Sequence, residues 1–388
     1  MASLLISASS LLAAPDGGPS RVLSPGHLRI EDGVIAEVGE GRPAGEPGVD
    51  LDGGLLAPGL VDLQVNGFFG YDMMDAGEDG WHTVVRRLPE TGVTAFLPTF
   101  ITAPVEAQAA ALRRTRDLLP GLPAGGSRVL GVHLEGPFLT ERRKGAHNAA
   151  WLTDPTPEAV ATLLETGLVR LVTLAPERDG ALEAVRTLTA AGVLVSVGHS
   201  DATAAQVAAA ADAGARKVTH IFNAQSGIDH RAPGVAAQAL ADDRLSPGLI
   251  LDLHHVSAPV ARLVFRAAAG RVVLVTDAAS AAGMPPGDYE LGGQPIRMPE
   301  AGPPLRADGT LAGSGLRLDE AIANAVGIGV DPVTAVDAAT RVPADLIGRP
   351  DLGRIAPGAA ADLVWLGPDH RAHATWIAGE NVFGGDHE

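Results

Sequence analysis

The sequence contains no cysteine among its 388 residues. This absence excludes disulfides, zinc ribbons and thiol nucleophiles, so any bound metal must be held by His, Asp or Glu side chains. Basic residues are also scarce, because 29 Lys and Arg stand against 46 Asp and Glu and give a net charge of −17. A nucleic-acid partner would require a basic surface, so we expect none. An anionic small molecule would have to be met by a few well-placed cations.

Long apolar runs are lacking as well. No run reaches the ~20 residues that a membrane-spanning helix needs, so we expect no membrane partner. The apolar start of the chain has no basic residue before Arg21, whereas a secretory signal carries positive charge ahead of its apolar segment. We therefore interpret this start as a β-strand and expect a soluble, cytoplasmic protein. Hydrophobic residues make up 46% of the chain, which is enough for a sizeable core.

The two ends of the chain resemble each other. Residues 27–39 read as two alternating strands around Asp32–Gly33, which is a strong hairpin signal. Residues 353–368 and 372–383 again read as short strands separated by turn residues. These patterns predict a small β-sandwich domain built from residues 1–57 and 351–388.

The middle of the chain, residues 58–350, alternates between short apolar runs and helical stretches such as 104–119 and 202–214. The runs are Leu60–Asn66, Val93–Phe100, Val129–Leu134, Val169–Leu174, Val193–Val197, Lys217–His220, Leu249–Leu253 and Val272–Thr276. Eight successive βα units predict a (β/α)8 TIM-type barrel. The alternative is an open doubly wound sheet, which is disfavoured because no GxGxxG follows the first run.

Catalytic side chains of such barrels lie at the C-terminal ends of the strands. Five of the 12 histidines stand at or just after predicted strand ends, namely His133, His199, His220, His254 and His255. Glu135, His199 and His220 would make a known catalytic metal set, which leaves Asp277 as an acid/base. A single histidine at a strand end is more often an ordinary, partly buried residue. The prediction therefore depends on four such groups coming from four strands.

Several neighbours of this set have two interpretations. Gln64 and Asn66 share one face at the first strand's end, although primary amides are poor ligands for transition metals. His133 faces the same way as Glu135 and is either another ligand or, as we favour, a side chain that orients Glu135. Arg231, in a Gly- and Pro-rich loop, is either a solvated arginine or a fork that binds an anion.

Eight motifs extend over nearly the whole chain. They are HLEGPF, KGAHN, GHSDAT, THIFNA, HRAPG, LHHV, VTDA and DGTLAGS. Their order and spacing resemble those of N-acetylglucosamine-6-phosphate deacetylases of the amidohydrolase superfamily. The resemblance implies hydrolysis of the acetamide of N-acetylglucosamine 6-phosphate to glucosamine 6-phosphate and acetate. The same chemistry on N-acetylgalactosamine 6-phosphate or another N-acyl substrate is an alternative, as is a non-catalytic sugar-phosphate sensor.

The resemblance also implies roles for individual residues. One divalent ion, Zn²⁺ with Fe²⁺, Co²⁺ or Mn²⁺ as alternatives, would sit on Glu135, His199 and His220, with Asp277 as acid/base. Gln64 and Asn66 would line the place of a missing second ion and contact a water on the metal or the substrate. The implied substrate contacts are Ala146, His147, Asn223, Ala224, Arg231, His255, Leu311, Ala312 and Gly313.

The same resemblance implies a homodimer in which Arg231 reaches the phosphate across the interface. Two features depart from the family pattern. Gln225 stands where relatives usually carry methionine, and the loop 298–309 is unusually rich in proline. Neither touches the proposed chemistry.

Overall fold

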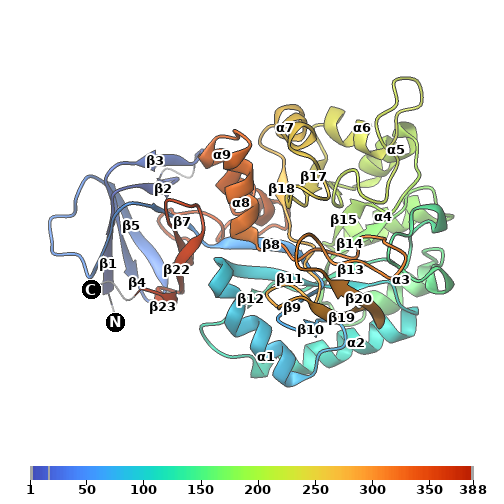
Figure 1. The fold of residues 1–388 in the computed structure, drawn as a ribbon, viewed down its shortest axis with the longest axis horizontal. Coiled ribbons are helices and arrows are strands. Elements are labelled where there is room, and N and C mark those ends of the chain that lie inside the picture. Colours follow the sequence, from blue (N-terminus) through green and yellow to red (C-terminus); the bar gives the residue numbers. More distant parts are fainter. Residues whose placement is uncertain (1–2, 16–17, 386–388) are drawn as a thin grey trace.

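A parallel barrel forms the larger part of the molecule, which is a computed structural model that describes residues 3–15 and 18–385 (Figure 1). Its strands are β8 (Leu60–Val65), β11 (Val93–Ile101), β13 (Val132–Glu135), β14 (Val169–Leu174), β15 (Leu194–Val197), β16 (Lys217–Val218), β17 (Ser246–Leu249) and β18 (Val273–Leu274). They pair in chain order, and a parallel bridge between Val65 and Ala278 brings the last unit back to the first. The predicted barrel is confirmed, and the open-sheet alternative is wrong.

Helices connect the strands on the outside of the barrel (Figure 1). They are α1 (Glu78–Arg87), α2 (Val105–Leu118), α3 (Pro157–Leu164), α4 (Ala181–Ala190), α5 (Ala204–Ala213), α6 (Val235–Ala241), α7 (Ala258–Ala267), α8 (Leu318–Gly327), α9 (Pro332–Asp337) and α10 (Arg341–Leu346). Helix α5 begins with a capping box, in which the Thr203 and Gln206 side chains accept each other's backbone N–H. None of the helices within the described ranges has the length and apolarity to cross a bilayer.

Two barrel strands depart most from their predicted bounds. The third is interrupted, because β12 (Arg128–Val129) and β13 are separated at Gly131, whose φ of 131° and crowded surroundings suit only glycine. The seventh was predicted at Leu249–Leu253 but lies at Ser246–Leu249, and the apolar run continues past its end to Leu251. Residues 250–251 are buried as a loop that enters the top of the barrel, so burial rather than pairing explains their apolar character.

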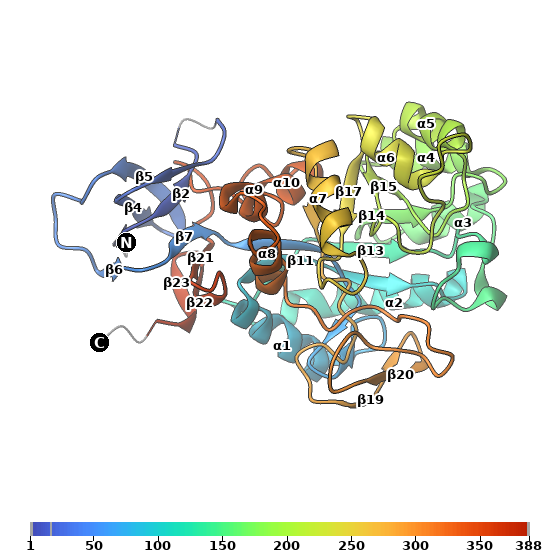
Figure 2. The ribbon, with the colours of Figure 1, turned by 45° about the horizontal axis from the view of Figure 1, so that its top comes forward.

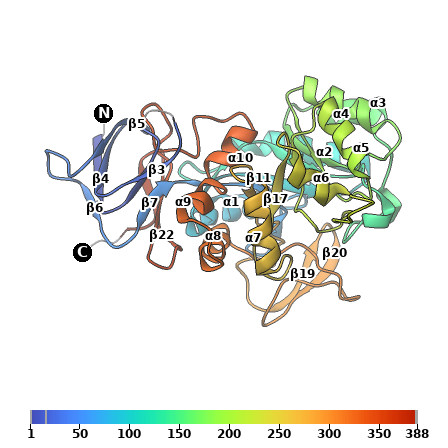
Figure 3. The same cartoon turned by 90° about the horizontal axis from the view of Figure 1, so that it is seen from above.

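Two further sheets lie beside the barrel, and the second contains strands from both ends of the chain (Figures 1 and 3). One has the order β5 (Val34–Glu40), β4 (Gly26–Glu31), β1 (Ser3–Ala8), β6 (Val49–Leu51). The other has the order β23 (Glu380–Gly384), β22 (Ala372–Ile377), β21 (Leu363–Leu366), β7 (Leu55–Pro58), β2 (Leu11–Ala13), β3 (Arg21–Leu23). The β4–β5 hairpin turns at Asp32 and Gly33, both with positive φ, as predicted.

An apolar cluster formed by side chains from both sheets, among them Ile6, Leu28, Leu363 and Trp376, fills the small β part. The domain boundaries after residues 57 and 350 stay a prediction, and β7 extends one residue past the first of them. Residues 1–2, 16–17 and 386–388 of the predicted small domain lie outside the described residues.

A hairpin of β19 (Gly287–Leu291) and β20 (Gln294–Met298) stands out from the barrel between α7 and α8 (Figures 2 and 3). A smaller pairing of β9 (Gly67–Phe68) with β10 (Tyr71–Asp72) follows the first barrel strand. Short 3-10 helices occur at Leu88–Thr91, Leu119–Gly121, Glu141–Arg143 and Ala149–Trp151. The chain after β20 runs back over the barrel mouth, where it helps to enclose the candidate site.

Candidate metal centre and active site

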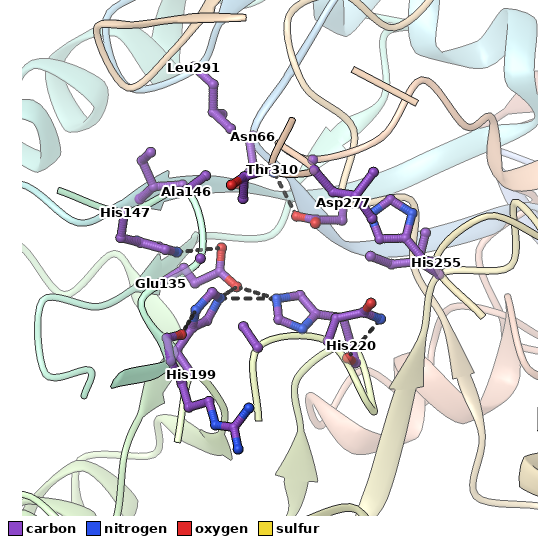
Figure 4. A pocket seen from close by; sticks show the side chains of 18 of the residues that line it. Asn66, Glu135, Ala146, His147, His199, His220, His255, Asp277, Leu291 and Thr310 are labelled. Atoms are coloured by element: carbon purple, nitrogen blue, oxygen red, sulfur yellow. Dashed lines mark hydrogen bonds and ion pairs between the residues drawn. The ribbon is translucent and has the colours of Figure 1, made fainter. Parts of the chain in front are cut away.

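Four of the predicted groups meet at the C-terminal mouth of the barrel (Figure 4). Glu135 is the last residue of β13, while His199 and His220 each follow their strand by two residues and Asp277 follows β18 by three. The φ angles of His199, His220 and Asp277 are 47°, 21° and 52°. Left-handed backbone is costly for non-glycine residues and often occurs at functional sites. Here it turns the chain sharply at three strand ends.

Glu135, His199 and His220 converge on one point. The Oε1 atom of Glu135 lies 3.0 Å from Nε2 of His220 and 3.3 Å from Nε2 of His199, and the two nitrogens are 3.2 Å apart. Ligand atoms about 2.1 Å from a single tetrahedral ion are about 3.4 Å from one another. These three groups could therefore hold a metal ion with little rearrangement.

The tautomer of His199 agrees with a ligand role. Its Nδ1 lies 2.9 Å from the backbone carbonyl oxygen of Arg143, which can only accept a hydrogen bond. Nδ1 must therefore carry the proton, and Nε2 presents its lone pair to the convergence point. Burial opposes ionisation of Glu135, but the adjoining His199 and His220 side chains hold the pKa of this carboxyl well below its usual range.

Gln64 and Asn66 contact the carboxylates of the site. The Gln64 Nε2 group donates to Oε1 of Glu135 at 2.9 Å and to Oδ1 of Asp277 at 3.0 Å. Asn66 Nδ2 donates to the same Asp277 oxygen at 2.7 Å. Asp277 Oδ1 is therefore fixed by two amides, whereas no described residue hydrogen-bonds with Oδ2. Burial, aided by the charge of Glu135, raises the pKa of Asp277.

His147 is held against the site by Thr102. The backbone N–H of Thr102 donates to Nδ1 of His147 at 3.3 Å, so a neutral ring carries its proton on Nε2. Burial lowers the pKa of His147 to about 3, which keeps the ring neutral. Its Nε2 lies 3.7 Å from Oε2 of Glu135. Sequence reasoning did not select Thr102, although it is a polar residue just after a predicted strand.

His133 lies beneath the site and does not line the cavity. Its Nδ1 is 3.2 Å from the hydroxyl of Thr99 and its Nε2 is 2.8 Å from the hydroxyl of Thr173. Burial lowers the pKa of His133 to about 3. Both ring nitrogens are thus engaged by hydroxyls, and orientation of Glu135 by His133 stays a prediction.

A cavity of about 380 Å³ opens above these groups. It is lined by most of the predicted residues, namely Asn66, Glu135, Ala146, His147, His199, His220, Asn223, Ala224, His255, Asp277, Leu311 and Gly313. Gln64, His133 and Ala312 are buried behind its walls. Lining residues that the sequence did not point to include Ile101, Ile250, Leu291 and Thr310.

The predicted phosphate arginine is not in the cavity of its own chain. Arg231 is exposed on the loop after Phe222, and its backbone N–H donates to Asp229 Oδ1 at 2.8 Å. Arg142 and Arg143 line the cavity instead, and each lies 2.8 Å from a carboxylate oxygen of Asp201. Neither arginine is among the substrate contacts predicted from the sequence.

Comparison with known proteins agrees with this geometry. Residues 55–382 match the amidohydrolase family. The chain is 39% identical over 358 residues to N-acetylgalactosamine-6-phosphate deacetylase of Escherichia coli O157:H7, covering 91% of this chain and 93% of that protein. It is 38% identical over 335 residues to N-acetylglucosamine-6-phosphate deacetylase of Vibrio furnissii, covering 84% and 83%.

A solved structure shares the entire fold. The N-acetyl-D-glucosamine-6-phosphate deacetylase of Mycobacterium smegmatis, in complex with N-acetyl-D-glucosamine-6-phosphate, superposes with a TM-score of 0.92 at 34% identity. The match covers 99% of this chain and 100% of that one. The chain therefore belongs to the amidohydrolase family, in the group that contains the N-acetylglucosamine-6-phosphate deacetylases.

Proposed function

We propose that this protein hydrolyses the acetamide of N-acetylglucosamine 6-phosphate, releasing acetate and leaving glucosamine 6-phosphate. The observation that carries the proposal is the convergence of Glu135, His199 and His220 beside a carboxylate, Asp277, at the base of a cavity. The names and coverage of the relatives support the substrate class.

One divalent metal ion per chain completes the proposed site. Glu135, His199 and His220 would hold it, and Zn²⁺ is the first choice for two imidazoles and a carboxylate, with Fe²⁺, Co²⁺ and Mn²⁺ as alternatives. When bound, such an ion polarises the amide carbonyl and lowers the pKa of a water beside it.

Asp277 is the proposed acid/base. Its Oδ1 is fixed by Gln64 and Asn66, so the carboxylate plane cannot rotate freely while Oδ2 remains available. Oδ2 takes a proton from the attacking water and delivers it to the nitrogen of the departing amine. The raised pKa, caused by burial and by Glu135, suits a carboxylate that must accept a proton before returning it.

We further propose a homodimer in which Arg231 serves the neighbouring subunit's cavity. Its position on an exposed loop, outside the cavity of its own chain, supports this role. A planar guanidinium can bind a phosphate through two hydrogen bonds, which makes it a suitable anchor for the 6-phosphate. A cytoplasmic location, where phosphorylated sugars are made, belongs to the same proposal.

The galactosamine epimer is the second candidate substrate, because a relative at 39% identity carries that name. Acetate release should be measured from both N-acetylhexosamine 6-phosphates, unphosphorylated N-acetylglucosamine and an N-acyl amino acid. We expect one of the two phosphosugars to give the highest kcat/KM. A preference for the N-acyl amino acid, or release from none of them, would refute the proposed function.

Two variants test the roles of the residues. Asp277→Asn should retain metal and ligand but turn over at least ~100-fold more slowly, the scale of lost acid/base catalysis. Arg231→Ala should raise KM for the phosphosugar. If Arg231 acts across the interface, mixing the two variants creates dimers with one intact site, and these dimers should turn over low concentrations of phosphosugar faster than either variant alone. No recovery in dimers shown to have exchanged subunits would contradict action across the interface.

A further inference from the structure

The turn Asp252–His255, which follows β17 at the barrel mouth, has an unusual construction. One carboxylate oxygen of Asp252, Oδ1, accepts the backbone N–H groups of His254 at 2.9 Å and His255 at 2.8 Å. Leu253 lies between them with a φ of 63°, a left-handed conformation that is unfavourable for leucine. The side-chain hydrogen bonds of Asp252 thus hold a strained turn beside the cavity.

The second oxygen of the same carboxylate binds the His255 ring. Asp252 Oδ2 lies 2.7 Å from His255 Nδ1, and the two side chains are only 10% and 4% exposed. Burial alone would favour the protonated acid, but hydrogen bonds with His255 lower the pKa of Asp252. An ionised carboxylate can only accept, so the His255 ring carries a proton on Nδ1.

This arrangement aims the other ring nitrogen at the substrate cavity. His255 lines the cavity, and its ring lies beside Asp277 in Figure 4. Across residues 3–15 and 18–385, no side chain or backbone group hydrogen-bonds with Nε2 of His255. The neighbouring His254 is exposed and does not line the cavity, so the turn selects one histidine of the pair.

Positive charge is scarce in this cavity, although the proposed substrate is an anion. The two arginines of its wall, Arg142 and Arg143, are both paired with Asp201. The charged groups that act on the His255 ring are Asp252, through Nδ1, and Asp277. With Nδ1–H donated to Asp252, an anionic group at Nε2 would accept a second N–H of the ring, so His255 is well placed to bind such a group.

We propose that Asp252 is a positioning residue for substrate binding: it fixes the His255 ring so that Nε2–H donates to the phosphate of the substrate. The inference rests on the proposed function, because it assumes a phosphorylated substrate. It concerns Asp252, which touches neither the substrate nor the metal site and acts only through His255. The expected effect is therefore on KM for the phosphorylated substrate rather than on kcat.

The two carboxylate oxygens of Asp252 have different partners, Oδ1 the backbone and Oδ2 the His255 ring, so a single variant can change one contact and keep the other. In Asp252→Asn, the remaining oxygen can still accept the two backbone N–H groups, whereas the new NH₂ group replaces the acceptor of His255. We expect KM for the phosphosugar to rise about tenfold or more, with kcat changed little, as for loss of a hydrogen bond to a charged group. Cleavage of unphosphorylated N-acetylglucosamine should be nearly unaffected. Asp212→Asn, on the outer helix α5, is the matched control for loss of one negative charge.

A double-mutant cycle separates action through His255 from a general structural effect. His255→Asn should raise KM to a similar extent, and the Asp252→Asn/His255→Asn double variant should show no further rise. Multiplicative effects of the two changes, or an unchanged KM in Asp252→Asn, would overturn the proposal. Absence of acetate release by the parent enzyme would instead refute the proposed function.

Nitrogen NMR of the histidine rings gives a readout independent of turnover. In the parent protein the His255 signals, assigned with His255→Asn, should show a protonated Nδ1. Addition of glucosamine 6-phosphate, the proposed product, should yield the doubly protonated ring, whereas unphosphorylated glucosamine should not. An unprotonated Nδ1 in the parent, or the same response to both sugars, would contradict the proposal.

Discussion

Gln64→Leu removes the side chain that links the proposed metal site to the proposed acid/base. Gln64 is completely buried, and its single NH₂ group donates to both Glu135 and Asp277. Leucine has a similar volume but no donor, so two buried carboxylates would each lose a hydrogen bond. Asp277 would keep the bond from Asn66 at 2.7 Å, and Glu135 would keep its contacts with the two histidines.

The expected size follows from these contacts. A hydrogen bond to a charged group contributes about 1.5–3 kcal/mol, and removal of a side chain that supports a metal ligand weakens metal affinity about 10–100-fold. We therefore expect the metal dissociation constant of Gln64→Leu to rise by about that factor. With the metal supplied in excess, kcat should still fall about tenfold or more, because Asp277 Oδ1 has lost one of its two fixed partners.

Metal affinity can be measured by competition with a chromophoric chelator, and kcat by acetate release at saturating metal. Gln108→Leu is the matched control, because Gln108 is also fully buried but donates to backbone carbonyl groups instead of carboxylates. The control should lose stability and retain metal affinity within a few fold. Metal affinity and kcat within twofold of the parent in Gln64→Leu would refute the assigned link.

Two further predictions concern the surroundings of the site. Arg306 donates to the carbonyl oxygen of Ala146 at 3.0 Å and so joins the proline-rich loop 298–309 to the cavity wall. Arg306→Ala should raise KM about fivefold in steady-state kinetics, because this hydrogen bond is lost. An unchanged KM would argue against a role of this contact in substrate binding. Lys217 is fully buried with no hydrogen-bond partner among the described residues, and burial lowers its pKa from 10.5 to about 8. The unfolded chain therefore binds more protons than the folded protein between about pH 8 and about pH 10. The free energy of unfolding of the parent, measured in urea relative to Lys217→Met, should rise by roughly 2–4 kcal/mol across that window. The same pH dependence in the parent and in Lys217→Met would contradict the lowered pKa of Lys217.

The barrel could be predicted because its signal is repeated. Each unit combines a short apolar run with a helical stretch, and an error in one unit leaves the others intact. The seventh strand was misplaced because an apolar run records burial, and the loop at residues 250–251 is as buried as the strand before it. Pairing partners, which decide where a strand ends, are distant in the sequence.

The convergence of Glu135, His199 and His220 could be predicted because the strand ends of a barrel meet at one mouth. The contacts that orient these side chains were less accessible. The carbonyl of Arg143 fixes the tautomer of His199, and a backbone N–H of Thr102 fixes that of His147, yet backbone groups have no residue-specific signal. Asp252 was passed over for a related reason, because its role depends on a strained turn that only the backbone geometry reveals.

The amides at the end of the first barrel strand bear directly on the number of ions. Gln64 and Asn66 direct their NH₂ groups to Asp277 and Glu135, and primary amides are weak ligands for transition metals. The most direct test of the account is the metal content of the purified protein, measured by mass spectrometry of the elements after removal of loosely bound ions. The account predicts one ion per chain in the parent protein. In His199→Ala both the ion and the activity should be lost, and excess metal should restore neither of them. Two tightly bound ions per chain, or one ion retained in His199→Ala, would contradict it.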